Sequence, residues 1–172
     1  MSKLKIILML SGYQLTWLMC IFGEVLYKTY IPGLLFGLIF LLISFIYSHN
    51  KKKFCFIVFT ISIPGYLFDS ILVFLNFCRY ETSLHFGLLP IWMLILWPSF
   101  ATLFDEVFTF LSKYKLLATV LSCLLGPLTY YSGSLLGLLN INQLVLFITS
   151  MVIFWGIIML YYLKFLLNIK FN

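Results

Sequence analysis

The stretch KKKFCFIVFTISIPGYLFDSILVFLNF, residues 51–77, decides the fold class of this chain. Three lysines precede twenty-four residues in which Asp69 is the single charged side chain. A helix over 54–77 would be about 36 Å long, which is enough to cross the roughly 30 Å hydrocarbon core of a bilayer. The stretch therefore predicts a transmembrane helix that follows a basic loop.

The composition extends this interpretation to the whole chain. Its 172 residues are 63% hydrophobic and 9% charged, whereas soluble domains carry about 25% charged residues. So much apolar surface needs lipid as its solvent, and the length leaves no room for a separate soluble domain. We predict one all-α, polytopic transmembrane bundle of about six spans. The predicted spans are 6–23, 31–47, 54–77, 86–111, 116–136 and 144–163, the first of them uncleaved.

The basic residues are distributed unequally between the two sides of this bundle. Six spans put both termini on one side, and that side would hold nine of the eleven basic residues. Only Lys28 and Arg79 would lie on the other side. By the positive-inside rule we expect both termini in the cytoplasm. The net charge of +6 then reflects topology, and we expect no nucleic-acid partner.

Motifs for cofactor or metal chemistry are missing from the sequence. It has no phosphate-binding loop, no nucleophile elbow, no HExxH zinc motif and no dinucleotide fingerprint. Its two histidines are thirty-six positions apart, in loops predicted on opposite faces. We therefore expect no metal and no cofactor. Cys20 and Cys78 are both predicted near the outer face, where either a disulfide or apolar packing is open to them.

Asp69 is the strongest candidate for a functional residue, because ionisable groups inside a span are costly. At about 1.5 Å per residue, Asp69, Tyr130 and Trp92 lie at similar depths near the outer face. We predict Asp69 and Tyr130 as catalytic residues. Trp92, together with Glu24 and Arg79 at the outer surface, is predicted to bind the ligand. The alternative is that Asp69 is structural and ties the third span to the fifth.

Other polar or small residues allow two interpretations each. Asp105 is a further binding candidate, but it lies about 20 Å from Asp69 in depth and could equally be an interfacial charge. Gln14, Trp17 and Ile21 share one face of the first span with Glu24, and helix packing explains that stripe. The two GxxxG patterns, 33–37 and 133–137, favour packing within the chain, with a homodimer as the alternative.

Several residues in a fixed order resemble a known family. They are Trp17-x-x-Cys20-x-x-Gly23, Asp69, Pro90-x-Trp92, Leu96-Trp97, Phe100-Ala101-Thr102, Gly126-Pro127, Tyr130 and Gly133-x-x-x-Gly137. Over about residues 10–140 the chain resembles small bacterial inner-membrane proteins that are catalogued only as a domain of unknown function. The resemblance implies that membrane location and no particular activity. Members tend to be encoded near lipid-modifying enzymes, which favours lipid chemistry. Where the family pattern has an Asn-His pair, this chain has Asp105-Glu106, which weakens the case for a site there.

Three functions follow as hypotheses. The first is a protein that handles or modifies a lipid or another apolar small molecule, as an enzyme or as the accessory subunit of a membrane enzyme. The second is a small proton- or cation-coupled transporter or flippase, although the sequence shows no inverted repeat. The third is a structural assembly protein. Membrane lipids are the partners expected under the first hypothesis.

Overall fold

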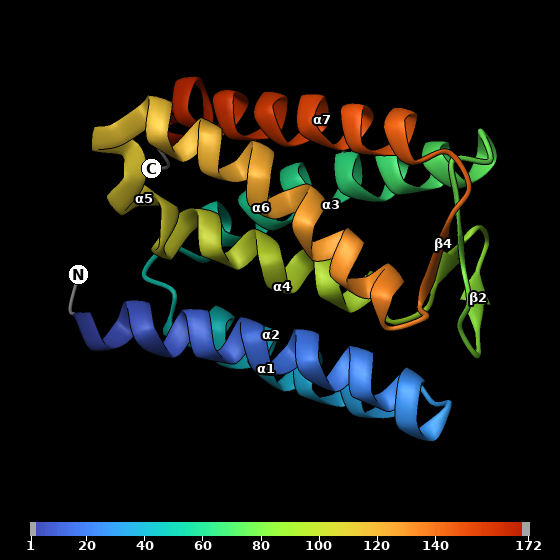
Figure 1. The fold of residues 1–172 in the computed structure, drawn as a ribbon. Coiled ribbons are helices and arrows are strands. Elements are labelled where there is room, and N and C mark those ends of the chain that lie inside the picture. The colour runs from blue at the N-terminus through green and yellow to red at the C-terminus, as the bar shows by residue number, and fades with distance from the viewer. Residues whose placement is uncertain (1–2, 170–172) are drawn as a thin grey trace.

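The computed structural model is an all-α bundle with a small strand link at one end (Figure 1). It describes residues 3–169, apart from the side chains of Lys3, Asp105, Glu106 and Phe110. The elements are α1 (Lys3–Tyr27), α2 (Ile31–Tyr47), α3 (Lys51–Phe74), β1 (Cys78–Tyr80), β2 (His85–Phe86), β3 (Leu89–Pro90), α4 (Met93–Glu106), α5 (Phe108–Leu111), η1 (Ser112–Tyr114), α6 (Lys115–Leu135), β4 (Leu139–Ile141), α7 (Leu144–Lys164) and η2 (Leu166–Asn168).

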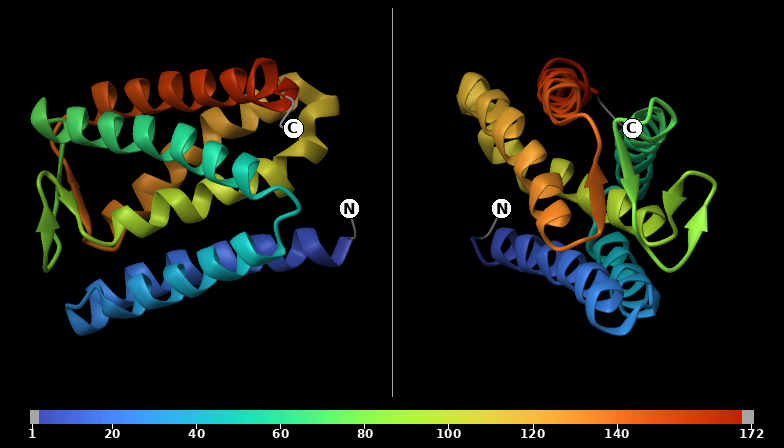
Figure 2. Two further views of the ribbon diagram at one scale, coloured as in Figure 1. Left: turned by 180° about the vertical axis from the view of Figure 1, so that it is seen from behind. Right: turned by 45° about the vertical axis from the view of Figure 1, so that its right-hand side comes forward.

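The long helices form three antiparallel pairs, α1 with α2, α3 with α4, and α6 with α7. Helix α4 lies in the middle, because α1 and α2 both pack on it, while α7 faces it from the opposite side (Figures 1 and 2). Both ends of the described chain lie at the same end of the bundle. This arrangement agrees with an even number of helices that cross the membrane.

Helices α1, α3, α6 and α7 are long and apolar enough to cross a membrane, and α2 and α4 are shorter apolar helices. The outer surface is itself apolar: Leu116, Phe74 and Val145 are each more than three-quarters exposed. Such a surface is stable only in an apolar solvent. The chain is therefore a helical bundle of the membrane-protein class.

The predicted helix over 86–111 is wrong in its first part. Residues 85–90 instead form a short hairpin, in which β2 pairs with β3 and His85 lies opposite Pro90. Gly87 makes the turn with a φ of 63°, a conformation that favours glycine. The helix begins only at Met93, so Trp92 is at its N-terminus, and α4 gives way to α5 at Val107.

The other five predicted spans correspond to helices whose ends differ from the prediction by four residues or fewer. Helix α1 continues to Tyr27, so Glu24 belongs to a helix and not to the predicted loop. Helix α3 begins at the lysine triplet, because the Asn50 side chain accepts a hydrogen bond from the Lys53 backbone N–H at 2.9 Å. That bond satisfies one of the unpaired N–H groups of the first turn.

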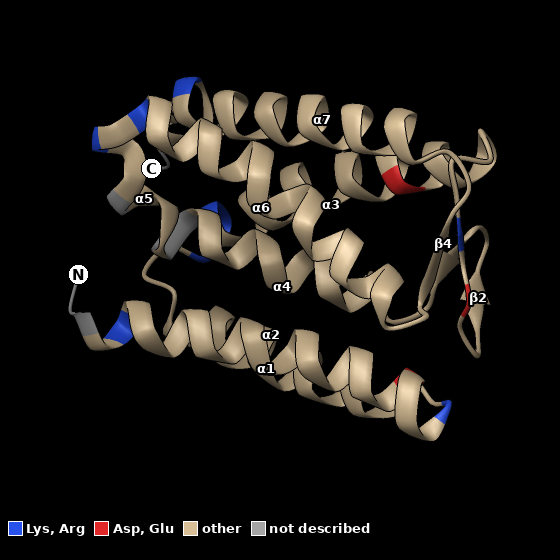
Figure 3. Ribbon diagram, in the orientation of Figure 1, with Lys and Arg blue, Asp and Glu red and all other residues tan. Residues whose placement is uncertain are grey.

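The two ends of the bundle differ in charge and structure (Figure 3). One end carries the lysines at the start of α3, in η1 and at the start of α6, together with Lys164; we call it the lysine end. At the opposite end, which we call the strand end, β1 pairs antiparallel with β4, with Arg79 opposite Asn140. This pairing joins the segment after α3 to the segment between α6 and α7.

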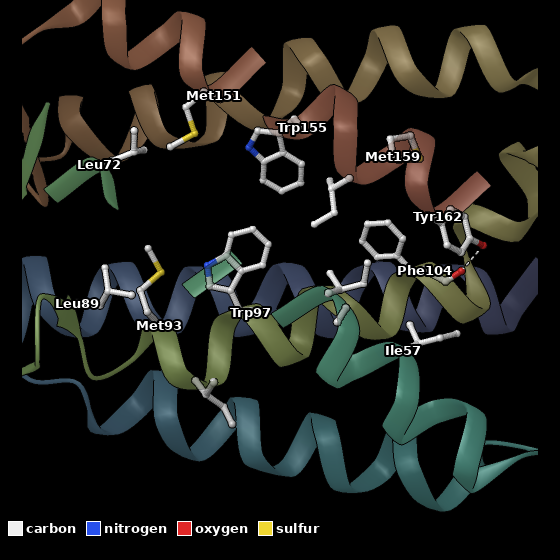
Figure 4. Packing of buried hydrophobic residues seen from close by; sticks show 14 of the residues in the cluster. Ile57, Leu72, Leu89, Met93, Trp97, Phe104, Met151, Trp155, Met159 and Tyr162 are labelled. Carbon is white, nitrogen blue, oxygen red and sulfur yellow. Dashed lines mark hydrogen bonds between the residues drawn. The ribbon is translucent and has the colours of Figure 1, made fainter. Parts of the chain in front are cut away.

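Aromatic side chains fill the space between α4 and α7 (Figure 4). Trp97 and Trp155 stack with ring centroids 5.7 Å apart, and Phe104 meets Tyr162 edge-on at 4.9 Å. The Tyr162 hydroxyl also donates a hydrogen bond to the Phe104 carbonyl oxygen. These rings form the core between the two helices.

Candidate functional site

Asp69 is fully buried and bonded to two other helices. The Trp97 indole N–H, from α4, donates to Oδ2 at 2.7 Å. The Tyr130 hydroxyl, from α6, donates to Oδ1 at 2.9 Å and to Oδ2 at 3.0 Å. One carboxyl group thus joins α3, α4 and α6 near the strand end. The structure brings Asp69 and Tyr130 together, at the similar depths that the helix count predicts.

Two glycines make this arrangement sterically possible. Gly65 lies one turn before Asp69 on α3, and a Cβ there would be 2.4 Å from the Trp97 ring. Gly126 lies one turn before Tyr130 on α6, and a Cβ there would be 2.3 Å from the Trp155 ring. The stacked indoles therefore fit between two helix backbones that lack side chains at the points of contact. Trp97 reaches Asp69 from this position.

A pocket of about 540 Å³ lies next to this centre, between α1, α4, α6 and α7. Trp97 and Tyr130 both line it, whereas Asp69 lies behind them and does not. The wall is mostly aliphatic and aromatic. The volume falls in the range of small-molecule sites, which are typically apolar with a few placed polar groups. Asp69 can therefore act on a bound molecule only through the hydroxyl and indole groups that it holds.

The stripe on the first helix belongs to the same pocket. Gln14, Trp17 and Ile21 line it from α1, so that their shared face contacts the cavity and not only another helix. Gln14 is exposed on the pocket wall, and none of the hydrogen bonds described within the protein involves its amide. The buried indole N–H groups of Trp92 and Trp155 also have no partner among the described residues. Unpaired polar groups inside a membrane are costly.

Trp92 and Tyr80 close the pocket at the strand end. Trp92 is 5% exposed, and its ring meets Tyr80 edge-on at a centroid distance of 6.4 Å. Residues of a strand alternate between two sides, so Tyr80 faces the bundle while Arg79 faces out. Burial, and then the nearby Asp69 carboxyl, raise the pKa of Tyr80 well above its usual 10. The Tyr80 hydroxyl therefore stays protonated.

Arg79 and Glu24 do not line the pocket. The Arg79 side chain is 76% exposed and lies 3.6 Å from Glu81. Glu24 is 1% exposed, and its carboxylate accepts bonds from the Ser83 backbone N–H at 3.0 Å and hydroxyl at 2.8 Å. Glu24 thus fastens the β1–β2 connection to the end of α1, so its contacts are those of a structural residue. The Asp105 side chain lies outside the described residues.

Cys20 and Cys78 form no disulfide in the structure, where both are buried free thiols. Cys20 packs against Gly33 of α2. Burial, with a smaller contribution from Asp69, raises the pKa of Cys78 to about 12. Cys78 is therefore an unreactive thiol at neutral pH.

The sequence did not single out Trp97, Tyr80 or Gln14 as site residues. Trp97 is twenty-eight positions from Asp69, and no spacing rule connects two helices of unknown packing order. A usable signal existed for Gln14, because an amide in the middle of an apolar span is itself unusual. The inward direction of Tyr80 depends on β1. This strand has only three residues, which is too few for an alternation pattern to be recognised in the sequence.

The fold and the site together define a class: a polytopic membrane bundle with a buried carboxyl group beside an apolar pocket. The family described as "Protein of unknown function (DUF2878)" matches residues 6–161, and the chain belongs to this family. Comparison with curated proteins and with solved structures gave no match. The residues of the site are therefore the basis for the function proposed below.

Proposed function

We propose that this protein binds a lipid or another apolar small molecule in the pocket, as an enzyme or as the accessory subunit of one. The observation that supports this function is the pocket itself. It is about 540 Å³ in volume, and it carries on its wall two groups hydrogen-bonded to a buried carboxyl. An apolar wall with a few placed polar groups is typical of small-molecule sites.

Tyr130 is the group that would touch a bound molecule. Its hydroxyl donates to Asp69, which leaves the oxygen lone pairs able to accept a proton or a hydrogen bond from a ligand. Asp69 would set the direction of that hydroxyl and favour partial negative charge on its oxygen. In this scheme Tyr130 is the catalytic or binding residue, and Asp69 is a positioning residue.

The proposed location is a bacterial inner membrane, with the lysine end in the cytoplasm. The charge difference between the two ends supports the orientation, because basic residues are retained on the cytoplasmic side. The pocket would then meet the lipid of the bilayer, which is where an apolar ligand is available. A membrane enzyme that shares this lipid is the natural partner for an accessory role.

Gly133 offers a sharp test, because it lines the pocket and a Cβ there would meet nothing within 4 Å. In Gly133→Trp the Cβ would stand in open space, and the indole should occupy part of the pocket. Leu128→Trp, on the same helix but exposed and outside the pocket, is the matched control. Purified protein would be extracted and its bound molecules identified by mass spectrometry.

We expect wild type and Leu128→Trp to carry the same apolar molecule and Gly133→Trp to lose it. Equal amounts of every lipid in all three proteins would contradict the proposed function. A whole-membrane lipid profile would then separate binding from chemistry. A lipid species that changes with Asp69→Asn at matched protein abundance indicates a reaction, and unchanged profiles indicate binding alone.

A further inference from the structure

The pocket is elongated along the helices. Its lining on α6 extends along one stripe from Ala118 to Gly133, about 22 Å of helix. On α1 it extends from Leu10 to Ile21, about 16 Å. Helix α1 packs mainly on α2 and α4, and α6 packs mainly on α7, so the pocket lies between two helices held by different neighbours. This shape fits a chain that lies along the helices.

The polarity of the wall changes along this length. Towards the strand end the lining includes Tyr80, Trp92 and Tyr130. Towards the lysine end it is formed mainly by Leu103, Phe108, Leu111 and Ala118. Two serines also line this part: Ser122 already donates to the Trp155 carbonyl oxygen, and Ser11 is exposed. An amphiphile would therefore place its polar head towards the strand end and its tail towards the lysine end. Gln14 lies about 16 Å from the start of α1, near the middle, where its exposed amide takes part in no described hydrogen bond within the protein.

The charge of the pocket wall limits which polar head group a bound amphiphile can have. None of the described side chains that line the pocket is basic or acidic. Arg79 is turned outwards and paired with Glu81, so it does not serve as a counter-ion. An anionic head would be desolvated in the pocket without a partner, which costs far more than burying a hydroxyl that is hydrogen-bonded. The Gln14 amide, which both donates and accepts, matches a hydroxyl or carbonyl group.

We infer that the pocket takes an uncharged, single-chain lipid whose hydroxyl or carbonyl head lies between Gln14 and Tyr130 and whose tail points to the lysine end. This inference rests on the proposed function and adds to it the class and direction of the ligand. It excludes phospholipids with anionic heads as occupants, although these surround the protein.

Two photoreactive probes of equal chain length test the inference. One is a long-chain alcohol and the other the corresponding carboxylic acid, each with a diazirine at the end of the tail. Both would be added to vesicles that contain the full-length protein, and the labelled peptides would be mapped by mass spectrometry. We expect the alcohol to label the segment 103–121 at the lysine end, at least about fivefold more than the acid.

Gln14→Leu removes the amide while keeping a similar volume, and no described hydrogen bond within the protein is lost. It should lower labelling by the alcohol about fivefold, the worth of one hydrogen bond. An unchanged unfolding temperature would show that the variant is folded. Equal or stronger labelling by the acid, or labelling by the alcohol at the strand end, overturns the inference and leaves the proposed function standing. Absence of labelling by both probes in the pocket overturns the proposed function as well.

Discussion

Asp69 illustrates how one residue organises its surroundings. Its carboxyl group is fully buried and receives hydrogen bonds from Trp97 and Tyr130. Removing a donor leaves a buried polar group partly unsatisfied, and in an apolar interior that penalty exceeds the net value of the bond itself. The proposed role of Asp69 and its stabilising contacts therefore depend on the same hydrogen bonds, so an activity assay alone would not distinguish them.

Tyr130→Phe should lower the stability of the protein. The substitution removes the hydroxyl that bonds to both carboxyl oxygens, and we expect a loss of about 1–3 kcal/mol in the free energy of unfolding. The control is Tyr131→Phe, at the neighbouring position, where the ring is 42% exposed and its hydroxyl has no described hydrogen bond. Thermal unfolding in detergent measures both. Equal unfolding temperatures for the two variants would contradict the importance of the Asp69 contacts.

Helix length and depth could be predicted at the scale of elements, but helix packing could not. Counting 1.5 Å per residue placed Asp69 and Tyr130 at similar depths, and the two are in contact. The same counting failed for the helix over 86–111, because Gly87 and Pro90 form a hairpin that an apolar composition conceals. The contact of Trp97 with Asp69 depends on a glycine opposite it, which is a property of two packed helices and not of one.

The glycines of α6 should respond differently to the same substitution. Gly126→Ala would place a methyl group 2.3 Å from the Trp155 ring, so we expect a loss of about 1–3 kcal/mol through overpacking. Gly133→Ala meets no atom within 4 Å and should be neutral or stabilising by up to about 1 kcal/mol. Unfolding temperatures measured side by side test the pair, and a reversed order would contradict the close contact between Gly126 and Trp155.

At the scale of the whole molecule, charge and hydropathy predicted the class of fold. Long apolar runs gave the bundle, and the observed helices place both chain ends together. The strand link between β1 and β4 could not be predicted, since three-residue strands in two distant loops leave no pattern. Nor could the pocket, because it lies between α1 and α6 and the sequence does not show which helices are neighbours.

The proposed orientation predicts which end of the bundle is accessible from outside the cell. In a variant whose four cysteines are replaced by serine or alanine, Thr82→Cys should react with a membrane-impermeant maleimide in intact cells. Lys52→Cys, at the lysine end, should react only after the membrane is opened. The opposite labelling pattern would reverse the orientation, and labelling of both sites in intact cells would show that the two ends are not separated by a bilayer.

The pairing of β1 with β4 also determines how late during synthesis the fold can be completed. The ribosome must add about sixty residues after Tyr80 before Leu139 exists as its partner. At about 5–20 residues per second, this takes about 3–12 s, during which α4 and α6 are made and inserted. Throughout that interval the edge of β1 is unpaired and open to incorrect strand partners. A nascent chain stalled before Leu139 would therefore expose an unpaired strand edge, which can pair with other chains and aggregate.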